Sequence, residues 1–394
     1  MPNPETVARS SAMTQNLPAH SSMGGSVMDR IINCPGSYWL AQLLKGAAGD
    51  DPEYRRDGVE AHLLASNCLT RKVDAWMEIG APEYANLTSE MADAVQVYLD
   101  YVRALPGEHS WELQMHRPEL HELAFGTLDF AAVPRTMGRV IEFVDYKHGE
   151  GVIVNPVKNI QVMYYAYLKL GDDPEFDDAE VVRLTIVQPR GRHPDGAVRS
   201  WDTTVGEIRR FAHEELVKTM EGVLARREIY LNMGSHCHFC PAKLICPAMS
   251  TVADAANALS TNKEISVAVL SDEDIGSWYE RAEVMKFWLK AIGDEALTRL
   301  KAGRKVPGLK LVPGIKHRVW KDETPLEEWT HPKAMTPAAV ADTGAAGKAF
   351  VKKWAFTPTG DPTVAFEKDN RMAISVQPVL ERFREGIDRL KQIT

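Results

Sequence analysis

The sequence predicts an α/β protein, in which a mixed central sheet is flanked by helices and followed by a smaller α+β domain. Two patterns along the chain predict this class. Segments with helical periodicity precede residue 105, and three short strand-like segments, a helix and a further strand follow them. At 394 residues, 44% hydrophobic and 25% charged, the chain is long enough for two domains with a substantial core.

Three helices are expected before the sheet, over residues 26–44, 57–77 and 87–105. The first is expected to break at Pro35, which places Cys34 at a helix end. The second carries His62. In the third, apolar residues recur at helical spacing, which is more typical of a core face than of a functional site.

The strands expected over residues 110–120, 125–133 and 139–147 carry the first chemical signal. Strand side chains alternate between faces, so Asp145 and Lys147 project from the same side, whereas Glu142 lies on the opposite face and is left out of the site. Asp129 lies near the end of the preceding strand. Two acids this close are unfavourable unless a cation neutralises them, and their oxygens suit Mg²⁺ or Mn²⁺.

A helix is expected from Pro156 to residue 170, followed by a strand over residues 181–188 and a helix over residues 205–226. Pro156 is a favourable residue for a first helical turn. Gln161 and Tyr165 are four residues apart and share a helix face, from which both can reach the sheet edge or a bound nucleic acid. Together with the acids and Lys147, these residues fit metal-assisted hydrolysis of a phosphodiester.

Four motifs in order resemble the RecB-like branch of the PD-(D/E)XK nuclease superfamily, and the whole chain, including the late Asp369–Arg371, resembles the phage- and prophage-encoded members of that branch. The four motifs are Gly58-x-x-x-His62, Gly126-x-x-Asp129, Asp145-x-Lys147 and Gln161-x-x-x-Tyr165. The resemblance implies a restriction-endonuclease-like core. It also implies that His62, Asp129, Asp145 and the carbonyl of Tyr146 hold the metal. By the same likeness, Lys147 is catalytic, and Gln161 and Tyr165 contact DNA or organise the site.

Each of these residues also has an ordinary structural interpretation. A lone histidine on a helix beside Val59, Leu63 and Leu64 is more often structural than a ligand. Asp145 and Lys147 could form a solvated salt bridge at a strand end, which would contribute little to stability.

Five cysteines are present, and three of them form a C-x₂-C-x₅-C motif at Cys237, Cys240 and Cys246. Clustered thiols in an intracellular chain indicate a metal or cluster. A cubane iron–sulfur cluster usually takes four thiolates, so Cys34, Cys68, His236 or His238 would have to supply the fourth ligand. Zinc is the alternative, because it accepts four cysteines or three cysteines and a histidine.

An early cysteine together with a late C-x₂-C-x₅-C resembles the iron–sulfur staple of AddB-type recombination nucleases and CRISPR-associated RecB-like exonucleases. The resemblance implies a 4Fe–4S cluster held by Cys34, Cys237, Cys240 and Cys246. Cys68 is then a buried thiol inside a helix. Such a cluster would tie together distant parts of the nuclease domain.

The expected domain order is a flexible tail (residues 1–22), a RecB-like nuclease domain with its staple (23–250), a linker (251–264) and an accessory domain (265–394). The accessory domain is expected to open with a long helix from Ser271 to about residue 302, ended by Gly303. A last helix is expected from about Pro378.

The net charge of −8 argues against a non-specific DNA-coating protein, which would usually be basic. Local basic surfaces are still expected, and residues 183–199 and 301–321 are the candidates. No apolar run approaches the length of a membrane span, and the amino-terminal segment does not have the pattern of a signal peptide. We therefore expect no membrane partner and a cytoplasmic location in a bacterial host cell.

The function expected from the sequence is that of a metal-dependent DNA exonuclease in phage recombination, replication or DNA-end processing. Its expected partners are single- or double-stranded DNA ends and, in addition, a recombination protein. The alternative from another class is a non-catalytic nucleic-acid-binding or regulatory protein with a zinc- or cysteine-based structural site.

Overall fold

The computed structural model describes residues 21–44, 53–136, 139–227, 229–253, 271–314, 316–321, 324–325, 336–343, 345–358 and 360–374. The chain forms two compact units, Met1–Val284 and Met285–Thr394. Most of the expected tail and linker, and the whole helix expected from Pro378, lie outside the described residues.

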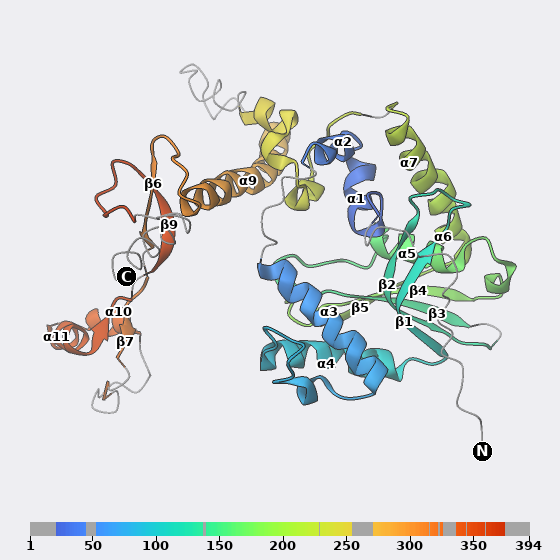
Figure 1. Cartoon of the computed structure of the whole chain (residues 1–394), viewed down its shortest axis with the longest axis horizontal. Helices are drawn as coiled ribbons and strands as arrows, with labels where there is room; N and C mark the ends of the chain where they lie inside the picture. The colour runs from blue at the N-terminus through green and yellow to red at the C-terminus, as the bar shows by residue number, and fades with distance from the viewer. Residues whose placement is uncertain are drawn as a thin grey trace, which may run out of the picture. The chain divides into compact units, whose positions relative to one another are not determined.

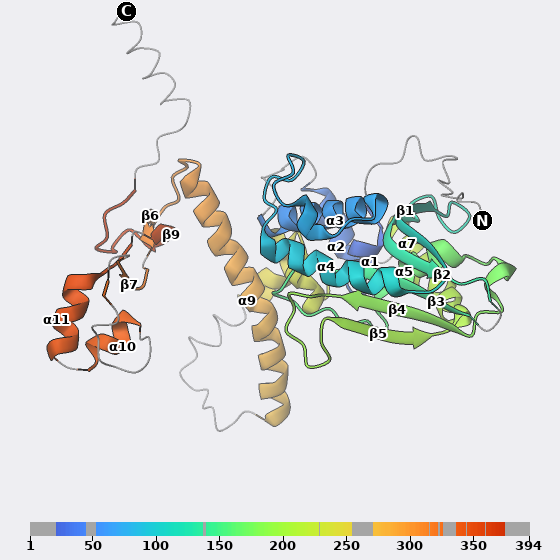
Figure 2. The ribbon, with the colours of Figure 1, turned by 90° about the horizontal axis from the view of Figure 1, so that it is seen from below.

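The first unit is built on a five-stranded sheet in the order β1-β2-β3-β4-β5 (Figure 1). The strands are β1 (Glu108–His116), β2 (Phe125–Val133), β3 (Val140–Tyr146), β4 (Val181–Val187) and β5 (Val198–Thr203). Only β3 and β4 pair in parallel, and the other neighbours are antiparallel. The predicted α/β class with a mixed central sheet is therefore confirmed. Strand β5, which lies along β4 at the sheet edge (Figure 2), was not predicted, since its sequence is largely polar and half exposed.

Helices cover both faces of this sheet. One hydrophobic cluster packs α1 (Gly25–Asn33), α5 (Ile160–Leu170), α6 (Val205–Phe211) and α7 (Val217–Leu224) against one face. A second cluster packs α3 (Glu53–Arg71) and α4 (Ser89–Ala104) against the other. A short helix, α2 (Gly36–Gln42), follows α1 after the predicted break at Pro35. The predicted helix over residues 205–226 is present as α6 and α7, joined by a π-helical turn, Ala212–Leu216.

The start of α5 differs from the prediction. The helix begins at Ile160 rather than Pro156, because the Asn159 side chain caps it by accepting a hydrogen bond from the backbone N–H of Val162 at 3.2 Å. Residues 156–158 form a turn in which Lys158 has a φ of +51°, outside the helical region.

In the first of the two predicted basic stretches, residues 183–199, three of the four arginines make contacts within the fold, and Arg192 is exposed. Arg183 pairs with Asp202 across β4 and β5 at 2.7 Å, and Arg190 pairs with Glu90 at 3.1 Å. Arg199 is buried and donates to backbone carbonyls, including that of Val154. These guanidinium groups are therefore used within the fold.

Helix α9 (Asp272–Lys301) contains the division between the two units, and the rest of the described second unit is a small mixture of helices and strands. Strands β6 (Leu309–Gly314) and β9 (Gly360–Phe366) pair antiparallel, as do β7 (Val319–Trp320) and β8 (Ala355–Phe356). Two helices complete it, α10 (Pro337–Ala341) and α11 (Ala345–Trp354). A Cβ atom at Gly347 would lie 1.9 Å from the carbonyl oxygen of Val340, so only glycine allows α11 to approach α10 this closely.

Within the described part of the chain, none of the helices combines the length and the apolar character needed to cross a membrane.

Candidate metal and cysteine sites

Three acidic residues lie in a row across neighbouring strands at one end of the sheet. The β2–β3 ladder ends at the pair Phe130 and Val144, so Asp129 and Asp145 are the next residues of their strands, where the two strands separate. On the other side of β2, the constant register with β1 places Glu112 opposite Asp129. Like charges this close destabilise one another, which makes the row a candidate cation site.

Helix α3 brings His62 to this row. Its Nδ1 atom lies 3.5 Å from Oδ1 of Asp129. Ligand atoms of His62, Glu112 and Asp129 all lie within 4.8 Å of one another, and the described residues contain no other group of three histidine, cysteine or acidic donors this close. The His62 ring also packs edge-on against Tyr146, with 5.4 Å between ring centroids, which fixes its orientation.

Asp145 is paired with Lys147, as expected for alternate residues on one strand face. The Lys147 ammonium lies 2.9 Å from Oδ2 of Asp145 and donates a hydrogen bond to Oε1 of Gln161 at 2.9 Å. Asp145 is only 2% exposed, and burial raises the pKa of its carboxyl even though Lys147 opposes the rise. A carboxylate held in this way is poised to gain from a further positive charge.

Tyr146 connects the acid row to the interior. Its backbone N–H donates to Oδ2 of Asp129 at 2.8 Å. The peptide group that follows Asp145 on β3 is therefore held against Asp129 on β2. Its hydroxyl lies 2.9 Å from Nδ1 of His148, and Nε2 of His148 lies 3.3 Å from Arg190. Burial and the Arg190 charge lower the pKa of His148 to about 4, so this histidine is neutral at pH 7 and the network holds the end of β3 in place.

Gln161 and Tyr165 share a helix face, as expected, but their contacts differ. Gln161 reaches Lys147, whereas Tyr165 is largely buried against β2. A Cβ atom at position 126 would lie 2.8 Å from Cε1 of Tyr165, so Gly126 of the G-x-x-D motif leaves room for this ring. Tyr165 therefore supports the strand that carries Asp129.

Glu112 is a site residue that the sequence did not indicate. It lies in an alternating strand segment and looks like any solvent-facing residue of β1. Its backbone φ of +47° is unusual for a residue other than glycine and interrupts the ladder beside Asp129. Desolvation and the Asp129 charge raise the pKa of Glu112, and the His62 charge opposes the rise. Only the strand register, which the sequence does not reveal, identifies it.

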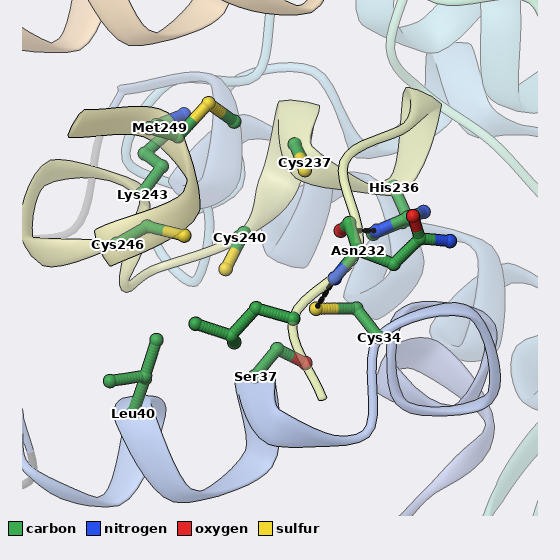
Figure 3. A pocket seen from close by; sticks show the side chains of 11 residues that line it. Cys34, Ser37, Leu40, Asn232, His236, Cys237, Cys240, Lys243, Cys246 and Met249 are labelled. Carbon is green, nitrogen blue, oxygen red and sulfur yellow. Dashed lines mark hydrogen bonds between the residues drawn. The ribbon is translucent and has the colours of Figure 1, made fainter. Parts of the chain in front are cut away.

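The second site is a small pocket lined by four cysteines, Cys34, Cys237, Cys240 and Cys246 (Figure 3). Cys34 comes from the end of α1, and the other three come from two 3₁₀ turns, Ser235–Phe239 and Lys243–Ile245, and the residues after them. In Figure 3 the four sulfur atoms point toward a common space. The backbone N–H of Asn232 donates to Sγ of Cys34 at 3.3 Å.

The pocket distinguishes between the candidates for a fourth ligand. Cys68 is buried in the core cluster of α3 and α4 and does not line the pocket. His236 does line it, but its Nε2 lies 3.0 Å from the carbonyl oxygen of Asn232. The ring of His238 packs against Phe239. Cys34 is therefore the residue that completes a set of four thiols.

The spacing of these thiols bears on the choice between zinc and a cluster. Zinc–sulfur bonds of about 2.3 Å in a tetrahedron place the sulfurs roughly 3.8 Å apart. Among the described residues, no three cysteine sulfurs lie within 4.8 Å of one another. The thiols are thus farther apart than in a bound zinc site, and the donor set itself is one that either a 4Fe–4S cluster or a zinc ion accepts.

The fold and these sites define an α/β protein whose mixed sheet ends in a group of acids, a histidine and a lysine, with a separate four-cysteine pocket. The chain belongs to the family described as "Protein of unknown function (DUF2800)", which it matches over residues 20–372.

No curated protein matches the chain. Eight chains of solved structures do. One of them, titled "Crystal structure of SSO0001", is 13% identical with a TM-score of 0.26, and the match covers 57% of this chain and 97% of that chain. Such a distant likeness says nothing about function.

Proposed function

We propose that this protein is a metal-dependent deoxyribonuclease with a RecB-like PD-(D/E)XK core, which hydrolyses phosphodiester bonds at the ends of single- or double-stranded DNA. The observation that carries the proposal is the convergence of His62, Glu112 and Asp129 beside the Asp145–Lys147 pair. The assignment as an exonuclease and the phage setting rest on the sequence resemblance.

The donor set fits a divalent cation. His62 offers an imidazole nitrogen, and Glu112 and Asp129 offer hard carboxylate oxygens, with Asp145 next along the row. Such ligands suit Mn²⁺ and Mg²⁺. When bound, the ion would polarise a phosphoryl oxygen and lower the pKa of a water molecule so that it can attack phosphorus.

The protein's own residues then orient the reacting groups. Lys147 is held by Asp145 on one side and Gln161 on the other, and its side chain is 26% exposed, so its ammonium can donate to a phosphate oxygen or to a water. The hydrogen bond from the Tyr146 N–H leaves Oδ1 of Asp129 directed at His62. Because none of these contacts involves a base, we expect little sequence preference and an affinity that falls steeply with salt.

A 4Fe–4S cluster in the four-cysteine pocket is part of the proposal, with zinc as the alternative. Cys34 and Cys237 lie about two hundred residues apart in sequence, so a bound cluster would close a very long loop. In this role the cluster is structural. It would hold α1, which packs against α5 in the core, to the cysteine-bearing turns.

The test is to incubate the purified protein with end-labelled linear DNA and with circular DNA, in the presence of Mg²⁺, Mn²⁺ or EDTA. We expect degradation of linear DNA that depends on metal and is abolished by His62→Ala, Asp145→Asn and Lys147→Met. The matched control is His213→Ala, since His213 also pairs with an acid, Asp172 at 3.0 Å, but does so away from the acid row.

Folding of each variant is checked by circular dichroism. Cleavage by folded Asp145→Asn at the wild-type rate would refute the site. Absence of cleavage by the wild type under all metal conditions, with DNA binding retained, would favour a non-catalytic nucleic-acid-binding protein. Metal analysis after anaerobic purification should find about four irons per chain, and one zinc without iron would refute the cluster.

A further inference from the structure

The two units of the chain carry opposite net charges, which the total of −8 conceals. Residues 1–284 contain 26 lysines and arginines against 41 acids, a net charge of −15. Residues 285–394 contain 20 lysines and arginines against 13 acids, a net charge of +7. A positive module attached to an acidic one indicates a polyanionic partner for the positive module.

Many of the basic side chains in the second unit are not neutralised within it. Some are paired, as Lys316 is with Asp361 and Arg371 is with Asp369. In the described part of this unit, a larger set has no carboxylate partner: Lys301, Lys305, Arg318, Lys321, Lys348, Lys352, Lys353 and Lys368. Their charge is therefore available to a ligand.

Several of these cations gather where α11 meets the β7–β8 pair. Lys348 and Lys352 are four residues apart on α11 and exposed, so they lie on one face of the helix. Lys353 follows them, with its ammonium 4.6 Å from the Trp354 ring centroid. Lys321 donates to the carbonyl of Lys353 at 2.9 Å, which brings the end of β7 to the same place.

An exposed aromatic residue lies beside these lysines. Phe356 on β8 is 47% exposed and pairs with Val319, which is 42% exposed, so both project from the same face of the β7–β8 pair. The opposite face is packed, since Trp320 contacts Phe350 of α11 at 5.7 Å between ring centroids. A solvent-facing phenylalanine among lysines is the combination with which proteins stack on bases while neutralising phosphates.

We infer that this surface, formed by Lys321, Lys348, Lys352, Lys353 and Phe356 and here called the α11–β8 surface, binds the sugar–phosphate backbone of nucleic acid. The lysines contact phosphates and Phe356 stacks on an unpaired base. A lipid bilayer fits less well, because the apolar residues Gly347 and Val351 of α11 are buried, and the helix has no open apolar face to insert into a membrane.

The α11–β8 surface contains none of the proposed catalytic residues. Binding is therefore expected even when the acid row is inactive, and the experiment uses full-length protein carrying Asp145→Asn so that DNA is not degraded. Fluorescent oligonucleotides of about 30 nucleotides, single-stranded and duplex, are titrated at several salt concentrations by fluorescence anisotropy.

Two variants test the surface. In Lys348→Gln/Lys352→Gln/Lys353→Gln, the slope of log affinity against log salt for single strands should become less negative by about 2, with about tenfold weaker binding near physiological salt. A control with the same loss of charge, Lys72→Gln/Lys218→Gln/Lys290→Gln, lies outside the surface and should change the slope by much less. These three lysines are exposed.

The second variant is Phe356→Ala, which should weaken single-strand binding about tenfold and leave duplex binding nearly unchanged. Its control is Phe366→Ala, because Phe366 is also exposed in this unit but lies on β9, beyond the α11–β8 surface.

Equal effects of the two lysine triples would overturn the inference, because net charge rather than this surface would then govern binding. Absence of oligonucleotide binding by the protein would also overturn the inference. Binding to anionic phospholipid vesicles is measured in parallel, and if the lysine triple lost vesicle binding instead of oligonucleotide binding, the surface would be assigned to lipid. If the wild type cleaves DNA but the lysine-triple variant binds DNA as tightly as its parent, only this inference is refuted. If the protein binds DNA through this surface but does not cleave it, only the proposed activity is refuted.

Discussion

Removing the Lys147 ammonium should make the stability of the first unit depend on the charge of Asp145. The Asp145 carboxyl is 2% exposed, and burial already raises its pKa above the ordinary value. In Lys147→Met, the pairing charge 2.9 Å away is lost while the acid stays buried. Breaking a buried ion pair in this way costs about 3–5 kcal/mol. Because Lys147 is itself 26% exposed, we expect the lower end, about 3 kcal/mol at pH 7.

The pH dependence has a definite sign. A carboxyl whose pKa is higher in the folded than in the unfolded protein binds more protons when folded, so the free energy of unfolding falls as pH rises between the two pKa values. The penalty in Lys147→Met should therefore be small near the ordinary aspartate pKa of about 3.9 and grow toward neutral pH. The wild type, whose Lys147 opposes the rise, should show a weaker dependence.

Urea denaturation from pH 4 to pH 8, followed by circular dichroism, measures this effect. Lys218→Met, which removes an exposed lysine, is the control and should change the free energy of unfolding by less than about 0.5 kcal/mol. The double variant Asp145→Asn/Lys147→Met should recover most of the loss, since no buried charge remains. A double variant as unstable as Lys147→Met would show that packing, rather than the buried charge, is responsible.

Three further outcomes are expected. Gly126→Ala places a methyl group 2.8 Å from the Tyr165 ring and should lower the free energy of unfolding by about 1–3 kcal/mol, partly restored by Tyr165→Leu in thermal denaturation. Cys34→Ser should lose bound iron while Cys68→Ser keeps it, as measured by iron analysis and visible absorbance, and equal retention would refute the four-cysteine site. Glu112→Gln should weaken Mn²⁺ binding measured by calorimetry. Without metal it should be more stable than the wild type at neutral pH, because the raised pKa of Glu112 makes its ionised form unfavourable, and a wild-type Mn²⁺ affinity would exclude it as a ligand.

Most of the helices and strands of the first unit could be predicted from the sequence because their patterns are local. Strand β2 has the predicted ends, since an apolar run is bounded by the Glu122–Leu123 turn region and Pro134. Strand β5 was missed, because half-exposed edge strands alternate weakly and resemble loops. The start of α5 was misplaced because Asn159, a side-chain cap, outweighed the preference of Pro156 for a first turn.

In the candidate site too, the features that depend on local sequence could be predicted, and those that depend on distant parts of the chain could not. The expectation that Asp145 and Lys147 face the same way depends only on strand alternation, and the structure shows them paired. The approach of His62 was expected from resemblance alone. Glu112 could not be found, because which residue of β1 lies opposite Asp129 depends on register, and register is set by the packing of the whole sheet.

The cysteine pocket has a consequence for how the protein is made. Cys34, which follows α1, leaves the ribosome about two hundred residues before Cys237, Cys240 and Cys246 do, so about half of the chain is synthesised before the other three thiols of the pocket are present. At roughly 5–20 residues per second, this interval lasts some tens of seconds at most. Binding of the proposed cluster would consequently be a late event of biosynthesis, and translation products that stop before residue 237 would leave α1 without the turns that complete the pocket.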